Sequence, residues 1–224
     1  GMNLYADRFR WGPFGTVIAH LSFVVILLGF FVSATTGFKD TQFTAPVGQR
    51  VEVGHETGLS VEAKSFRDVY YPDGSPSDYV SDLVLYKNGV QVDRQMVRVN
   101  QPLERDGVSF YQSFFGVAAS MKATDSAGNI LYGAAVPLAW TSDDGTHSIG
   151  QFDMKAQGLS VYVIGAASGK PDPNIKAGQM QLEIHQDGKT EPIATQVVDQ
   201  GKPATIAGVS YTFERTRPFT GLIV

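Results

Sequence analysis

One histidine, His20, lies within an otherwise uncharged and mostly apolar run near the start of the chain. The run begins at Trp11, and the first charged residue after it is Lys39. A membrane-spanning helix needs roughly 20 apolar residues, so the run is long enough to cross a bilayer. Ionisable side chains are costly inside a membrane and mark functional sites there. An imidazole at this position can ligate a metal or form an interhelical hydrogen bond, and the residue pattern alone leaves both chemistries open.

The other three histidines show no spacing typical of a metal site. They fall in or beside expected strands and turns, with no partner histidine two or four residues away: His55, His147 and His185. Metal sites need two or more convergent ligands, so we predict surface or structural roles for all three. The chain also contains no cysteine, which excludes disulfide exchange, cysteine-ligated zinc and cysteine nucleophiles.

Two pairs of aspartates have the chemistry of acid–base pairs or calcium ligands, Asp143 with Asp144 and Asp73 with Asp78. Both pairs lie in turns that contain Gly or Pro, where Asp caps the backbone, and we predict that structural role. Residues 165–170 are one residue short of a phosphate loop and are followed by proline where Ser or Thr is required. A Ser-His-Asp hydrolase remains an alternative, although the sequence contains no nucleophile elbow.

The helix that carries His20 is expected to span residues 13–36, with its N-terminus in the cytoplasm. Arg8 and Arg10 precede it with only Asp7 against them, and such a basic flank is retained on the cytoplasmic side. A cleaved signal peptide is the alternative, but its apolar region would be only about 7–15 residues long. We therefore predict an uncleaved anchor, with the remainder of the chain outside the cytoplasm.

The segment after this helix alternates apolar and polar residues almost throughout. Its clearest element is a hairpin with Asn88-Gly89 at the turn, because both central residues of such a turn need positive φ. About a dozen short strands with turn signals between them predict an antiparallel β-sandwich or barrel. Besides the hairpin strands 82–86 and 90–99, the expected strands are 49–53, 59–66, 110–114, 118–125, 130–140, 159–164, 180–186, 193–198 and 211–215. We predict no amphipathic helix in this segment.

The predicted organisation is a cytoplasmic flank at 1–12, a transmembrane helix at 13–36 and an extracytoplasmic β domain at 39–224. Gly1, which precedes Met2, is interpreted as a residue left from cloning. The Pro- and Gly-rich stretch 169–174 either separates two β subdomains or forms a long hairpin loop. A formal net charge of −4 and no cluster of Lys or Arg exclude nucleic acid as the expected partner.

Two aromatic groups in the β domain could contact a partner or the edge of a ligand. They are Tyr70-Tyr71 and the group Phe110-Tyr111 with Phe114-Phe115. Aromatic residues at alternate strand positions more often pack in the core, and we predict core packing for both groups.

Several motifs occur in a fixed order along the chain. They are Arg10-Trp-Gly…Ala19-His20-Leu-Ser…Ile26-Leu-Leu-Gly29, Thr36-Gly-Phe-Lys39, Tyr71-Pro-Asp-Gly-Ser-Pro-Ser-Asp-Tyr-Val-Ser81, Val99-Asn-Gln-Pro-Leu103, Asp106-Gly-Val-Ser-Phe-Tyr-Gln112 and Phe219-Thr-Gly-Leu-Ile-Val224. In these motifs the chain resembles the third transmembrane helix and β domain of the ResB-type cytochrome c biogenesis proteins of the System II, or Ccs, pathway. The matches are dense over residues 8–115 and sparse between 120 and 215. In that family a transmembrane hairpin precedes this helix and another helix follows the β domain, so the resemblance implies that the chain is the central part of such a protein or a shortened relative.

The resemblance implies a component of a cytochrome c maturation complex that is not itself an enzyme. With a ResC-type partner, such proteins export haem across the membrane and present it to apocytochrome c. The resemblance also implies that His20 is an axial ligand of haem b iron, in a site shared with the partner subunit. Neutral imidazole is a suitable haem ligand, and low-dielectric surroundings favour the neutral form. The alternatives are a membrane-tethered adaptor with no haem contact and an anchored extracytoplasmic hydrolase.

Helical geometry divides the predicted span into two faces. At about 100° per residue, small residues line one face and permit close helix approach. This face consists of Gly15, Ala19, Ser22, Gly29 and Ser33. His20 falls on nearly the opposite side, beside Thr16, Phe23, Leu27 and Phe31, a flank that suits a porphyrin or lipid tails equally. At ~1.5 Å per residue, His20 lies roughly 10 Å beyond Pro13, in the cytoplasmic half of the bilayer.

Overall fold

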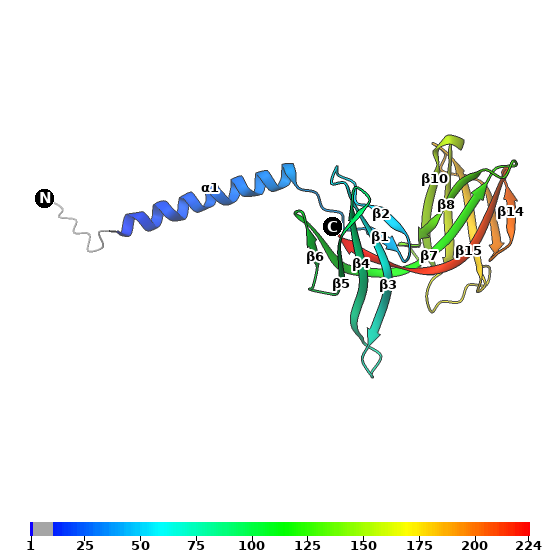
Figure 1. The fold of residues 1–224 in the computed structure, drawn as a ribbon, viewed down its shortest axis with the longest axis horizontal. Coiled ribbons are helices and arrows are strands. Elements are labelled where there is room, and N and C mark those ends of the chain that lie inside the picture. The colour runs from blue at the N-terminus through cyan, green and yellow to red at the C-terminus, as the bar shows by residue number, and fades with distance from the viewer. Residues whose placement is uncertain (2–10) are drawn as a thin grey trace. The chain divides into compact units, whose positions relative to one another are not determined.

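The computed structural model describes Gly1 and residues 11–224, which form two compact units, Gly1–Lys39 and Asp40–Val224. The first unit contains one helix, α1 (Gly12–Thr36) (Figure 1). Pro13 lies in its first turn, where a helix does not need the missing N–H. The helix ends at Gly37, whose N–H donates to the Ser33 carbonyl, and a Cβ on Gly37 would meet that oxygen at 2.8 Å.

The second unit consists of three antiparallel sheets. The six-stranded sheet contains β1 (Phe43–Pro46), β6 (Leu103–Arg105), β7 (Val108–Thr124), β8 (Ile130–Pro137), β14 (Pro203–Ile206) and β15 (Val209–Ile223). The five-stranded sheet contains β9 (Trp140–Thr141), β10 (His147–Met154), β11 (Leu159–Ala166), β12 (Gln179–Gln186) and β13 (Pro192–Asp199). The four-stranded sheet contains β2 (Arg50–Glu52), β3 (Leu59–Tyr70), β4 (Pro76–Lys87) and β5 (Val90–Val97). The predicted fold class is confirmed, as a mainly β chain with an N-terminal apolar helix, and the described sheets are open rather than closed into a barrel.

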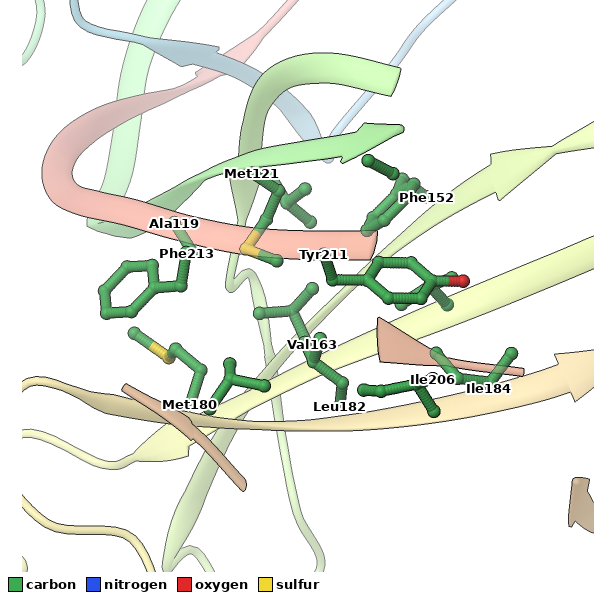
Figure 2. Packing of buried hydrophobic residues seen from close by; sticks show 14 of the residues in the cluster. Ala119, Met121, Phe152, Val163, Met180, Leu182, Ile184, Ile206, Tyr211 and Phe213 are labelled. Carbon is green, nitrogen blue, oxygen red and sulfur yellow. The ribbon is translucent and has the colours of Figure 1, made fainter. Parts of the chain in front are cut away.

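The long strands β7 and β15 connect the two ends of the β unit. They pair with each other from Tyr111 to Thr124 of β7, and Figure 1 shows this ribbon running past the four-stranded sheet at one end and the five-stranded sheet at the other. At the second end the ribbon packs over the five-stranded sheet and forms the main hydrophobic core. Figure 2 shows Tyr211 and Phe213 of β15 facing Val163 and Leu182 of the five-stranded sheet.

A buried polar cluster joins the four-stranded sheet to the ribbon. Ser81 of β4, Gln112 of β7 and Thr220 of β15 are all buried, and their side-chain oxygens lie 2.5–2.8 Å apart. The Gln112 amide donates to the carbonyl of Phe114. Because buried polar groups are costly unless they are hydrogen-bonded, this cluster sets how the strands meet.

The hairpin of β3 and β4 projects beyond the rest of its sheet (Figure 1). Pairing with β5 involves only Ser81–Lys87 of β4, and pairing with β2 involves only Ser60–Glu62 of β3. The outer part, residues 66–80, is therefore a two-stranded ribbon, which we call the finger. Its tip is a turn in which Tyr71 accepts from the N–H of Gly74.

The structure confirms the predicted hairpin turn and changes several other strand assignments. Asn88 and Gly89 have φ of 49° and 83°, as that turn requires. The expected strands 110–114 and 118–125 are one continuous strand, β7, and strand β10 was not predicted. The stretch 169–174 lies in the loop between β11 and β12, which are paired neighbours in one sheet. Apart from α1, the described residues contain only the three-residue 3₁₀ turn Lys155–Gln157 as helix.

Candidate functional site

The candidate site lies on α1, which has the composition of a membrane span. Residues Phe14–Thr36 have a mean hydropathy of 2.4, and none of the span is buried within the structure. Ser22, Thr35 and Thr36 direct their hydroxyls back to carbonyls of the same helix. Their hydrogen-bonding needs are met internally, so the helix presents an almost wholly apolar surface. Arg8, Arg10 and Asp7, on which the predicted orientation depends, lie outside the described residues.

The imidazole of His20 has one ring nitrogen engaged and one available. Nδ1 lies 2.7 Å from the carbonyl oxygen of Thr16, one turn earlier in the helix. A carbonyl oxygen only accepts hydrogen bonds, so Nδ1 carries the proton in this contact. In the neutral imidazole Nε2 then keeps its lone pair. This is the tautomer that metal-binding histidines adopt when a backbone carbonyl holds the other nitrogen.

A shallow hollow lies beside this imidazole. It has a volume of about 390 Å³ and is lined by Thr16, Val17, His20, Leu21 and Val24. The lining is aliphatic, whereas the predicted flank was aromatic, and of that flank only Thr16 contributes. The hollow places apolar surface beside the imidazole of His20.

The other histidines lie in the β unit, where His55 is in the loop between β2 and β3 with φ of 50°, and His147 and His185 hold local structure. His147 contacts Asp172 through Nε2 at 2.5 Å and the Thr146 hydroxyl through Nδ1 at 2.9 Å. His185 packs edge-on against Tyr162 and lies 3.8 Å from Glu183. Among the described residues there is no group of three or more His, Asp or Glu side chains that could hold a metal ion.

The row formed by Thr146, His147 and Asp172 resembles a hydrolase triad only superficially. The Thr146 hydroxyl also lies 2.7 Å from Asp144 Oδ1, and its single proton cannot serve both neighbours. Asp172 accepts from the backbone N–H groups of Asn174 and Ile175. The row therefore ties the loop after β11 to the start of β10.

Three of the four aspartates, Asp73, Asp143 and Asp144, lie in turns as predicted, whereas the prediction is wrong for Asp78, which lies within β4. Asp144 accepts from the Ser142 hydroxyl at 2.6 Å and from the Thr146 N–H at 3.0 Å, and these bonds hold its pKa well below the usual range. Asp73 accepts from the N–H and the hydroxyl of Ser75, which lowers its pKa as well. Asp78 pairs with Arg98 at 3.1 Å.

Sequence analysis missed a groove beside the middle of β7. It has a volume of about 970 Å³, and Phe66, Phe115, Phe219 and Met180 are among the residues that line it. The prediction of core packing holds for Phe110, which is fully buried, but it is wrong for Tyr70, Tyr71, Tyr111 and Phe115, whose exposed fractions are 50%, 56%, 42% and 38%. The available signal was the density of aromatic residues between Phe110 and Phe115, which core packing alone does not explain.

Comparisons with known proteins agree on one family. The ResB-like family model matches residues 1–223. The chain is 31% identical to the cytochrome c biogenesis protein CcsB of Synechococcus sp. (strain JA-3-3Ab) over 160 residues, which cover 61% of this chain and 33% of the relative. It is 25% identical to the chloroplastic cytochrome c biogenesis protein CCS1 of Oryza sativa subsp. japonica over 244 residues, or 93% of this chain and 42% of the relative.

The chain thus spans between a third and a half of the length of these relatives. No solved structure matches the chain significantly. Since the family model covers nearly every residue, the chain belongs to the ResB-like family.

Proposed function

We propose that this chain is a membrane-anchored component of a cytochrome c biogenesis complex, with His20 as an axial ligand to haem b in the membrane. The relatives named above are cytochrome c biogenesis proteins, and the family model covers nearly the whole chain. The observation that carries the haem assignment is the Nδ1 contact of His20 with the Thr16 carbonyl, which in the neutral imidazole leaves the lone pair on Nε2, within an apolar span.

The role of this chain is to hold and orient haem as cargo. An intramembrane imidazole supplies a neutral nitrogen ligand to haem iron. The Thr16 carbonyl fixes the tautomer and ring direction, as carbonyls beside metal-bound histidines commonly do. Val17, Leu21 and Val24 offer apolar contact to the ring system. One helix offers one axial ligand, so the second ligand comes from another helix, which we assign to a ResC-type partner subunit.

The β unit is proposed to lie outside the cytoplasm and to dock the partner subunit or apocytochrome c. The basic residues Arg8 and Arg10 before the span favour a cytoplasmic N-terminus. In this scheme the chain positions haem for transfer and is not an enzyme, since delivery requires binding and release rather than bond cleavage by its side chains.

This orientation can be tested directly because the chain contains no cysteine. A single cysteine in the β unit, introduced as Asp187→Cys, should react with a membrane-impermeant maleimide added to intact cells. A cysteine introduced as Asn3→Cys should react only after the cells are permeabilised. The reverse pattern of labelling would place the β unit in the cytoplasm and contradict the proposal.

The biogenesis role is tested by removing the gene and staining covalent haem on gels. The proposal predicts that mature c-type cytochromes disappear, whereas b-type cytochromes, which need no covalent attachment, remain. Complementation with the intact gene should restore the c-type bands. Unchanged c-type cytochromes in the deletion strain would contradict the proposed function, whatever His20 does.

A tethered adaptor without haem contact is the second candidate. It is favoured by the compact β unit, Asp40–Val224, which has its own core independent of α1. The two candidates differ in one outcome: an adaptor supports cytochrome c assembly equally well after His20→Ala.

A further inference from the structure

Strand β7 has one edge that is only partly paired. Along its length one edge pairs with β15. The opposite edge pairs with β6 over Val108–Phe110 and with β8 over Ala118–Thr124. Between them, residues 111–117 have no partner strand on this second edge among the described residues, and we call this stretch of it the open edge. Its one backbone bond to a neighbouring segment is donated by Leu138 to the carbonyl of Val117, at 2.9 Å.

The open edge lacks the features that normally protect an unpaired strand. Proteins block such edges with charged residues or proline, which prevents pairing with other chains. The edge strand β5 carries Asp93 and Arg94, and the edge strand β13 begins with Pro192. Residues 111–117 contain no charge and no proline. Instead Tyr111, Phe115 and Val117 are 42%, 38% and 45% exposed, so the edge is apolar as well as unpaired.

A β-bulge lies within the open edge. Gly221 of β15 pairs with Phe114 and the next residue pairs with Gln112, so Ser113 is the extra residue of β7. Bulges bend a strand and are common next to functional sites. This bulge interrupts the regular pairing of β7 with β15.

The groove of about 970 Å³ runs beside this edge. The finger forms one wall, where Phe66 stacks on Phe115 with ring centroids 5.0 Å apart and Tyr79 lies 4.9 Å from the same ring. Leu138, in the link between β8 and β9, and Met180 of β12 also line the groove. Unpaired backbone groups and exposed aromatic side chains therefore lie beside the same groove.

We infer that this open edge binds an extended segment of another polypeptide, which adds to the six-stranded sheet as a strand between β6 and β8. A row of alternating N–H and C=O groups is matched only by another extended backbone, not by a lipid or a folded surface. The seven residues span about 23 Å, the length of a typical added strand. Apolar side chains at alternate positions of the segment fill the groove beside Phe66 and Phe115.

The groove also contains charged side chains of both signs, Asp68, Lys176 and Arg217. Asp68 accepts from the Tyr70 hydroxyl at 2.7 Å, and Arg217 donates to the Ser120 hydroxyl and the Val47 carbonyl. Recognition at the open edge itself, which carries no charge, depends on backbone pairing and apolar contact, and it fits an extended polypeptide segment. The inference does not depend on haem ligation by His20.

The backbone test uses a fixed panel of fluorescein-labelled nine-residue peptides in which Val or Phe alternates with Ser or Thr. Binding to the full chain in detergent is measured by fluorescence anisotropy. Since only every second residue of an added strand directs its N–H to the edge, N-methylation should weaken binding about tenfold in one register and less than about twofold in the other. Failure of every peptide to bind, or equal loss in both registers, overturns the inference.

The protein-side test compares two substitutions at matched exposure. Val117 on the open edge and Met96 on β5 are both 45% exposed. Val117→Lys should weaken peptide binding about tenfold, because a charge now blocks the edge, whereas Met96→Lys should leave it within about twofold. Far-UV circular dichroism checks that both variants fold. Equal effects of the two variants contradict the inference. So does a wild-type dimer that Val117→Lys abolishes and that binds no peptide, since the occupant would then be a second copy of the chain.

Discussion

The aromatic ring of Phe114 packs directly on the backbone of Gly221, in the position that a Cβ of residue 221 would occupy. The same arrangement recurs two residues further along the ribbon, where the Phe219 ring covers Gly116, and the rings of Phe114 and Phe219 meet edge to face at 5.9 Å. The two glycines thus let two aromatic rings pack against the backbone of the β7–β15 ribbon, next to the bulge at Ser113.

Placing a methyl group under either ring should destabilise the β unit. A Cβ on Gly116 would lie 2.7 Å from the Phe219 ring, so Gly116→Ala and Gly221→Ala each force a ring to move, at a cost of about 1–3 kcal/mol. Gly133→Ala on β8 is the control, since its Cβ would meet only Ile130 at 3.4 Å. Urea denaturation of the full chain in detergent measures the difference. Equal stability of all three variants would show that the rings move freely.

We expect the substitution Tyr211→Phe to stabilise the β unit. The Tyr211 side chain is fully buried, its hydroxyl has no hydrogen-bond partner among the described residues, and burial raises its pKa to about 12 (Figure 2). An unsatisfied buried hydroxyl costs about 1–3 kcal/mol, so Tyr211→Phe should raise the free energy of unfolding by roughly 1 kcal/mol. Tyr132→Phe, at a half-buried position, is the comparison. A Tyr211→Phe variant that unfolds at lower urea than wild type contradicts this account.

The buried cluster of Ser81, Gln112 and Thr220 should behave as a unit. Gln112→Leu leaves two buried hydroxyls without their shared acceptor, and we expect a loss of about 1–3 kcal/mol in unfolding free energy. Replacing the whole cluster, with Ser81→Ala and Thr220→Val added to Gln112→Leu, should recover much of that loss, because no buried hydroxyl is then left without a partner. Urea denaturation of the single and triple variants measures this coupling, and strictly additive losses would contradict it.

The loop after β11 should make the β unit sensitive to acid. Backbone N–H groups of Asn174 and Ile175, together with His147, hold the pKa of Asp172 below its usual range. A lowered folded-state pKa gives stability that is complete above the unfolded carboxyl pKa of about 4 and is lost as the pH falls toward the folded value. Wild type should therefore lose stability progressively as the pH falls below about 5.

The variant Asp172→Asn isolates this effect. It removes the titrating group, so its urea midpoint should change less than that of wild type over the same pH range. Asp143→Asn, in the neighbouring turn, serves as the control and should follow wild type. If Asp172→Asn and wild type lose stability in parallel, other carboxylates account for the acid sensitivity.

Local patterns predicted the class of this fold well. The apolar run predicted a helix at 13–36, and α1 is found at Gly12–Thr36. The Asn88-Gly89 turn predicted the hairpin that β4 and β5 form. Both are encoded within a few neighbouring residues. Alternation along the chain also identified most strands, since each has one buried face.

Long-range features were not predictable in the same way. Gly116 looks like a break between two strands, yet it lies inside β7 because the Phe219 ring, over 100 residues later, covers it. The open edge exists because β6 ends and β8 begins at different points along β7, which is a property of pairing and not of any segment. His20 was identified from composition, but its contact with the Thr16 carbonyl required a side-chain conformation.

The central claim is that His20 ligates haem, and the Soret absorbance of the protein purified from its native membranes tests it most directly. We predict that His20→Ala lowers haem per protein at least about tenfold, because the only imidazole of the span is removed. Ser22→Ala, whose hydroxyl bonds within the helix on another face, should retain the wild-type spectrum. A His20→Ala protein with the haem content and Soret maximum of wild type would contradict the account.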